Sequence, residues 1–142
     1  MSYATLSDLY GRFGESEIIQ LTDADNTGTP DETTVDQAFA DAAAEINAAL
    51  VGRYRLPMSP VPELLTRIAC DLARESFYTD VMPDIVKNRA ATARRLLASI
   101  ASGTLRFEDA EPAAKGAVTS DARITKRRRR MRWPADGGGG LC

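Results

Sequence analysis

Three prolines within seven residues, Pro57, Pro60 and Pro62, constrain the fold of this 142-residue chain more than any other feature. Proline fixes its own φ angle and disfavours helix in the residue before it, so residues 56–62 are expected to form a stiff, extended connector. Gly52 is placed to end a preceding helix, and Pro62 suits the first turn of a following one. The sequence therefore predicts two helices that meet at a rigid joint.

We call this joint the proline corner. No reactive group surrounds it, so we interpret it as an element that specifies shape, not as an active site. It consists of Gly52, Tyr54, Leu56, Pro57, Pro60 and Pro62.

Apolar residues recur at intervals of three and four along three long segments, which is typical of amphipathic helices. The predicted helices cover residues 33–51, 62–79 and 83–102, with Thr33 or Thr34 as the N-cap of the first. The inner faces are predicted to hold Val35, Phe39, Ala42, Ile46 and Leu50, then Leu65, Ile68, Ala69, Leu72 and Ser76, then Val86, Ala90, Ala93, Leu97 and Ile100.

Residues 5–22 are expected to form short helical pieces that break at Gly11 and Gly14, with Thr5 or Ser7 capping the first.

After the last helix, residues 104–108 alternate between polar and apolar side chains, which predicts a short strand. The fold class is therefore all-α: a small helical bundle with a short C-terminal β segment and an extended C-terminal arm. Residues 1–110 form the predicted helical domain, and residues 111–142 form the predicted arm.

Composition disfavours several classes of function. The chain has no histidine, the commonest general base and metal ligand, and we expect neither an enzyme nor a cofactor. Its two cysteines, Cys70 and Cys142, fit a reducing compartment better than a disulfide framework. No apolar run is long enough for a membrane span, and no secretory signal is expected. Cys70 is expected in the core, and Asp71 and Glu75 are expected to form ion pairs with nearby arginines, Arg67 and Arg74.

The loop of residues 23–31 resembles the start of an EF-hand, with Asp23, Asp25 and Asp31 at three ligand positions. Thr34 stands where an EF-hand requires a bidentate glutamate. An ordinary polar loop is the preferred interpretation, and a calcium site is the alternative.

Charge is distributed unevenly along the chain. Residues 1–60 carry 10 acidic and 3 basic side chains, net −7, whereas the remainder carries 10 acidic and 15 basic side chains, net +5. This polarity suits head-to-tail self-association or docking on an unlike partner, and it is also compatible with ordinary solvated helix faces.

Much of the positive charge lies in a segment that we call the basic tail. Arginine neutralises phosphate and tryptophan stacks on bases, but no nucleic-acid recognition motif accompanies them. Docking on a protein, contact with nucleic acid and a free solvated tail all stay open. The basic tail comprises Lys126, Arg127, Arg128, Arg129, Arg130, Arg132 and Trp133.

The order of motifs over residues 1–110 resembles a family of Mu-like phage and prophage neck proteins. The resemblance rests on structural rather than catalytic motifs. They are Tyr3–Leu9, Leu21–Asp23, Val35–Ala38, Ala43–Asn47, Gly52–Pro57, Val61–Leu65 and Ala69–Arg74.

This resemblance implies a structural virion protein of the phage neck, assembled in the host cytoplasm. Such head–tail connectors form a ring, usually of twelve copies, between the portal protein and a downstream neck or tail-terminator protein. Packaged double-stranded DNA passes through the lumen, and the C-terminal arm grips the portal. For this chain, the basic tail is then the expected docking arm, and a nucleic-acid-binding module that acts through the same tail is the alternative.

Overall fold

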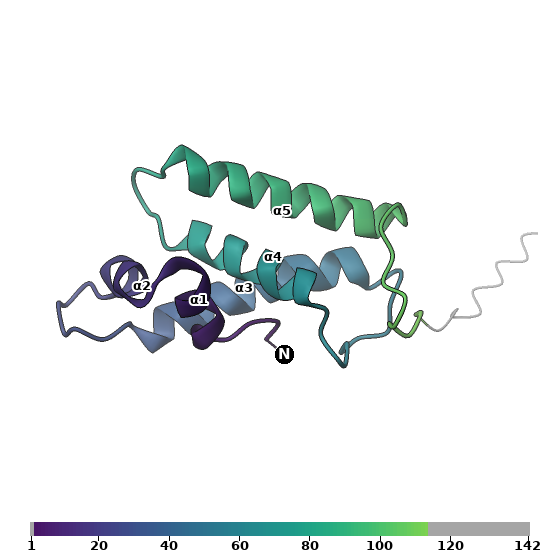
Figure 1. The fold of residues 1–142 in the computed structure, drawn as a ribbon, viewed down its shortest axis with the longest axis horizontal. Coiled ribbons are helices and arrows are strands. Elements are labelled where there is room, and N and C mark those ends of the chain that lie inside the picture. Colours follow the sequence, from purple (N-terminus) through teal and green to yellow (C-terminus); the bar gives the residue numbers. More distant parts are fainter. Residues whose placement is uncertain (1, 114–142) are drawn as a thin grey trace, which may run out of the picture.

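The computed structural model describes residues 2–113, which fold into a bundle of five α-helices (Figure 1). The predicted all-α class is confirmed. The helices are α1 (Leu6–Phe13), α2 (Glu15–Thr22), α3 (Glu32–Leu50), α4 (Glu63–Ser76) and α5 (Asp84–Ser102).

Helix α4 is the centre of the bundle. It packs on both α3 and α5, which also contact each other, while α1 packs on α2 and on α4. In Figure 1, α5 runs along the top of the molecule and α1 lies with α2 on the lower side. No helix in residues 2–113 is long and apolar enough to span a bilayer.

The predicted inner faces of α3 and α5 are confirmed, because every residue assigned to them is buried. The prediction for α4 is wrong at its last position, where Ser76 is exposed and its hydroxyl donates to the carbonyl of Ala73 at 2.7 Å. Phe77, one residue later, is buried in its place. The helix ends at Ser76, so the helical spacing no longer decides which side chain points inward.

Thr5 caps α1 as predicted, through a reciprocal pair of hydrogen bonds with Asp8. The predicted break at Gly11 is wrong, because α1 continues through this residue to Phe13. A single glycine costs a helix only about 1 kcal/mol, which packing overrides here. The chain does break at Gly14, whose φ of 92° is incompatible with a continued helix.

Helix α3 begins at Glu32, one residue earlier than predicted. Its N-cap is Asp31 and not Thr33 or Thr34. The Asp31 carboxylate accepts hydrogen bonds from the N–H of Thr33 at 3.1 Å and the hydroxyl of Thr34 at 2.7 Å. A carboxylate at this position also interacts favourably with the helix dipole.

The predicted strand at residues 104–108 is absent, and no strand occurs anywhere in residues 2–113. The left-handed Gly103 ends α5 as expected for a C-terminal glycine, with φ at 83°. The alternation that suggested a strand instead places Leu105 and Phe107 against the edge of the core. A strand requires a hydrogen-bonded neighbour, and this segment finds only an isolated bridge further along, at Pro112.

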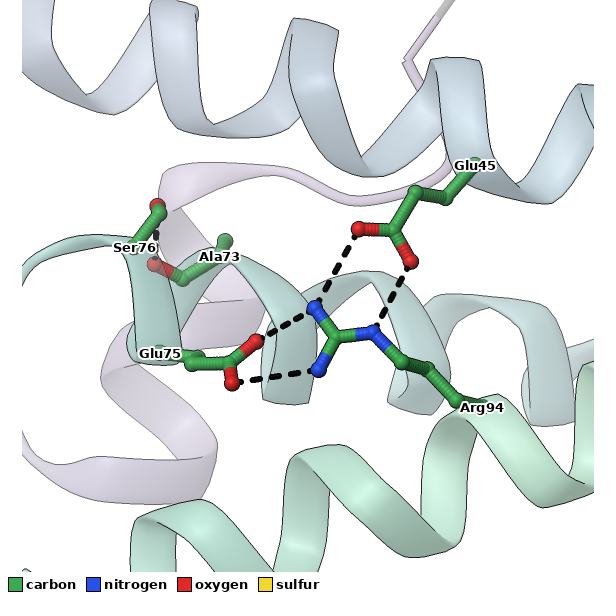
Figure 2. A network of polar contacts seen from close by, with 5 residues as sticks. All are labelled: Glu45, Ala73, Glu75, Ser76 and Arg94. Carbon is green, nitrogen blue, oxygen red and sulfur yellow. Dashed lines mark hydrogen bonds and ion pairs between the residues drawn. The ribbon is translucent and has the colours of Figure 1, made fainter.

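One arginine joins the three long helices. Figure 2 shows Arg94 of α5 between Glu45 of α3 and Glu75 of α4, with hydrogen bonds of 2.6–3.2 Å to the two carboxylates. Hydrogen bonds to both carboxylates raise the pKa of Arg94 above its ordinary value. The arginine side chain is 45% exposed, so this network fixes the relative position of the helices more than it adds stability.

Candidate protein-docking site

The proline corner lies against the last segment of the described chain. Residues 53–55 run antiparallel to residues 111–113, and Tyr54 forms a β-bridge with Pro112. Two backbone hydrogen bonds of 3.0 Å join the segments, donated by Arg55 N–H to the Glu111 carbonyl and by Ala113 N–H to the Arg53 carbonyl. The corner therefore holds the chain at the point where it leaves the helical body.

Tyr54 anchors this contact from the inside. Its side chain is buried, its ring centroid lies 5.6 Å from that of Phe107, and its hydroxyl accepts a hydrogen bond of 2.9 Å from the Phe107 N–H. The pairing therefore combines apolar packing with backbone hydrogen bonds.

Arg53 fixes the end of α5 to the same place. Its Nε donates to the carbonyl of Ala101 at 3.0 Å, and its guanidinium covers Gly103. A Cβ atom added at Gly103 would lie 2.6 Å from the Arg53 Nη1 and would displace this guanidinium, and the positive φ of Gly103 favours glycine.

Of the remaining residues of the corner, Gly52, Pro57 and Pro60 are exposed, Pro62 is half-buried, and Leu56 packs against the core. Leu56–Pro57 and Ser59–Pro60 are cis peptides, and Met58 between them is buried. Two hollows of about 400 and 340 Å³ border the loop; Pro57 and Pro60 line the first, and Pro60 and Pro62 line the second. Gly52 stands in the turn after α3, with no neighbouring atom within 4 Å of a Cβ placed there.

The basic tail lies outside residues 2–113, so its predicted docking role stays a prediction. The structure places only the first residues of the predicted arm, 111–113, which pair with residues 53–55. Sequence reasoning treated the corner only as a joint between two helices and missed its pairing with residues 107–113. Tyr54 and Phe107 are 53 residues apart, and no local pattern links them.

A buried carboxylate lies between α4 and α5. Asp71 is 8% exposed and lines a hollow of about 350 Å³ together with Arg67 and Arg89. Burial raises the pKa of Asp71 above its ordinary value, and the positive charges of Arg89 and Arg67 oppose this shift. Within the described part of the chain, Asp71 forms no ion pair.

The predicted ion pairs of Asp71 and Glu75 with Arg67 and Arg74 are therefore wrong, because none of these residues pairs with another of the four. Glu75 pairs with Arg94, and Arg74 pairs with Glu17 of α2 through a hydrogen bond of 2.9 Å from its Nε. The Arg74 guanidinium also lies 4.4 Å from the centre of the Phe13 ring. The two contacts of Arg74 join α1 and α2 to α4, and Phe13 and Glu17 are both distant from Arg74 in sequence.

Cys70 is buried in α4, as predicted, and is a free thiol. Burial raises its pKa to about 12, so the thiol stays protonated at neutral pH. A protonated, buried thiol is a poor nucleophile.

The acidic loop is organised by its own hydrogen bonds. One carboxylate oxygen of Asp23 accepts from the N–H of Thr27 at 2.9 Å, and the other accepts from the N–H of Gly28 at 2.8 Å. These bonds lower the pKa of Asp23, the Thr27 bond most. Among residues 2–113, no group of three or more metal-ligating side chains is assembled. The two hydrogen bonds to Asp23 give the loop the geometry of a self-capped turn.

The structure is a small helical module in which residues 111–113, after the last helix, are paired with residues 53–55. Residues 3–126 match the family described as Bacteriophage Mu, Gp36, and this chain belongs to that family. The resemblance to Mu-like phage proteins is thereby confirmed, and the match continues past residue 110 into the tail.

Two relatives illustrate the relationship. Gene product J of Escherichia phage Mu is 40% identical over 74 residues, which cover 51% of this chain and 52% of that protein. The Mu-like prophage FluMu protein gp36 of Haemophilus influenzae is 30% identical over 103 residues, which cover 72% of this chain and 73% of that protein. The aligned part of the chain thus spans about half the length of the first relative and nearly three quarters of the second.

Proposed function

We propose that this protein is a structural virion protein, a head–tail connector that forms a ring between portal and tail at the neck of a Mu-like phage particle. The observation that carries the proposal is membership in a family of Mu phage proteins over residues 3–126. The helical body forms the ring, and the protein acts by assembly rather than by catalysis.

The rooted tail supports a division of labour between body and arm. Residues 111–113 are paired with the proline corner, so every copy in a ring presents its tail from the same position. In this proposal the basic tail docks on the portal protein, with Arg127 to Arg130 and Trp133 as anchors. Arginine and tryptophan are the residue types that most often dominate binding energy at interfaces.

The test compares the particles that a Mu-like phage encoding this protein forms when the gene is present and when it is deleted. Loss of the protein should leave DNA-filled heads and separate tails in electron micrographs, and mass spectrometry should find the protein in complete particles. Infectious particles formed without the protein would overturn the proposal.

The tail is tested by truncation after Ala113, which preserves the pairing with the corner. The truncated chain should keep its helical circular dichroism and its melting temperature but should fail to join heads to tails. If the truncated chain still joined heads to tails, the proposed docking role of the arm would be wrong.

The alternative function, nucleic-acid binding through the basic tail, is favoured by the run of five consecutive basic residues from Lys126 to Arg130. It predicts submicromolar binding of duplex DNA by the free protein, with an affinity that falls steeply as salt increases. Weak binding with a flat salt response would exclude this alternative and leave the connector proposal intact.

A further inference from the structure

An apolar hollow with an acidic rim lies between the N-terminal segment and α3. It encloses about 540 Å³, and its apolar lining includes Leu6, Val35 and Phe39. The carboxylates of Glu32 and Asp36, one helical turn apart on α3, stand at its edge. Neither forms an ion pair with any residue in the described part of the chain. We call these five residues the acidic hollow.

A surface of the opposite character lies on α4 and α5. Ile85 is 57% exposed, and Val81 in the preceding loop is 86% exposed. Arg89 follows Ile85 by one helical turn, so the two share a face of α5. Both line the hollow beside Asp71, and Arg67 of α4 lines it too. We call Val81, Ile85, Arg67 and Arg89 the basic ridge.

Both arginines of this ridge are exposed, and the Arg89 guanidinium also lies 5.9 Å from the centre of the Phe13 ring. Neither Arg67 nor Arg89 forms an ion pair within residues 2–113. The buried Asp71 lines the same hollow as both arginines. Asp84, the nearest exposed acid on α5, is one position before Ile85 and therefore about 100° away around the helix.

We propose that the basic ridge of one copy of this protein docks in the acidic hollow of a second copy. Ile85 supplies the apolar side chain that enters the hollow, and Val81 extends the apolar contact beside it. Arg67 and Arg89 pair with Glu32 and Asp36, so two positive charges meet two negative charges. Exposed apolar side chains with a complementary pocket elsewhere on the same molecule characterise a protein–protein contact.

In a ring the contact is heterologous: the ridge of each copy docks in the hollow of the next copy, and the two surfaces share no residue. Each copy therefore offers one ridge and one hollow, and a heterologous contact generates a ring if its rotation closes and a filament if it does not. The inference rests on the proposed connector function and deepens it by naming the surface through which neighbouring copies meet.

A second copy fits the ridge better than a nucleic acid does. DNA phosphates can pair with the arginines, but they make no apolar contact with the exposed Ile85 and Val81. The carboxylates of the acidic hollow repel DNA, whereas its apolar lining suits these two side chains. Binding of the ridge to DNA is nevertheless a measurable outcome, and it would count against the proposal.

The experiment uses charge reversal in the full-length chain, measured by sedimentation velocity over a range of concentrations. A ridge variant carries Arg67→Glu and Arg89→Glu, and a hollow variant carries Glu32→Arg and Asp36→Arg. Each variant alone should associate more weakly than the unmodified chain by a factor on the order of a hundred, because like charges face each other. An equimolar mixture of the two should associate again, because every ridge then finds a hollow of opposite charge.

The matched control is Lys87→Glu with Arg95→Glu, which reverses two exposed charges of α5 outside the ridge and should leave association unchanged. Circular dichroism and thermal melting confirm that each variant is folded. The proposal is overturned if the unmodified chain stays monomeric at every concentration, if the variants associate normally, or if folded variants fail to rescue each other.

A second readout separates this inference from the proposed function. Normal incorporation of the ridge variant into complete particles, with unchanged self-association, would discard the interface and keep the connector. Absence of the unmodified protein from particles would discard the connector, whatever the sedimentation results.

Discussion

The hydroxyl of Tyr54 accepts a 2.9 Å hydrogen bond from the backbone N–H of Phe107, and the two rings lie 5.6 Å apart at an angle of 53°. This contact joins the turn after α3 to the segment after α5. It makes the proline corner the place where three parts of the chain meet: the end of α3, the end of α5 and the root of the tail.

Replacing Tyr54 with phenylalanine should lower the free energy of unfolding by about 1 kcal/mol, because the part-buried N–H of Phe107 loses its acceptor while the ring contact remains. Urea denaturation measures the change. Tyr78→Phe is the control, since the hydroxyl of Tyr78 makes no hydrogen bond within residues 2–113. Equal effects of the two substitutions would show that the Tyr54 hydroxyl is not a structural acceptor.

Two glycine-to-alanine substitutions should have opposite signs. Gly103→Ala should destabilise by about 1–2 kcal/mol, because alanine is strained in the left-handed region and its Cβ displaces the Arg53 guanidinium. Gly11→Ala should stabilise by about 0.5–1 kcal/mol, because this position is helical and has open space around it. Thermal melting of the two variants provides the comparison, and shifts in the same direction would contradict this account.

Arg94→Gln should destabilise the bundle by about 1 kcal/mol or less, because the ion pairs with Glu45 and Glu75 are partly exposed. The difference from the unmodified chain should shrink in 1 M salt, where the Debye length falls to about 3 Å. Arg95→Gln, one residue further along α5 and exposed, should have little effect at either salt concentration. A loss that does not depend on salt would assign the role of Arg94 to packing.

Asp71→Asn tests the buried carboxylate through pH. Burial raises the folded-state pKa of Asp71 above its unfolded value of about 3.9, so the folded protein binds the proton more tightly than the unfolded chain does. The resulting stabilisation is fully present below the unfolded pKa and is lost as pH rises through the folded pKa. The unfolding free energy of the native chain should therefore fall relative to that of Asp71→Asn as pH rises from 3 to 7. A constant difference across this range would show that Asp71 titrates as it does in the unfolded chain.

Periodicity predicted the parts of the fold that depend on local pattern. The positions of α3 and α5 that were predicted to face inward are all buried, because a long helix with one apolar face buries that face against its neighbours. The predicted end of this helix at residue 102 is also confirmed, because a glycine after the last periodic residue, here Gly103, commonly ends a helix. The family was identified from the motifs around the proline corner.

The errors arose where several local solutions compete or where the partner is distant. Asp31, Thr33 and Thr34 are all capable N-caps, and only the entry path of the chain decides among them. The alternation at residues 104–108 is common to a strand and to an extended segment packed on helices. Arg94 and Arg74 choose acids on other helices, which no spacing within their own helix reveals. The basic tail and its docking role stay predictions.

The antiparallel pairing of residues 111–113 with residues 53–55 has a mechanical consequence. A force on the tail is not applied to the end of α5 directly, because it first reaches two backbone hydrogen bonds that lie beside the buried Tyr54 ring. The load then divides between the end of α3 and the segment after α5, and α4 joins both through the core. A pull applied at residue 113 therefore acts on the whole bundle and not on α5 alone.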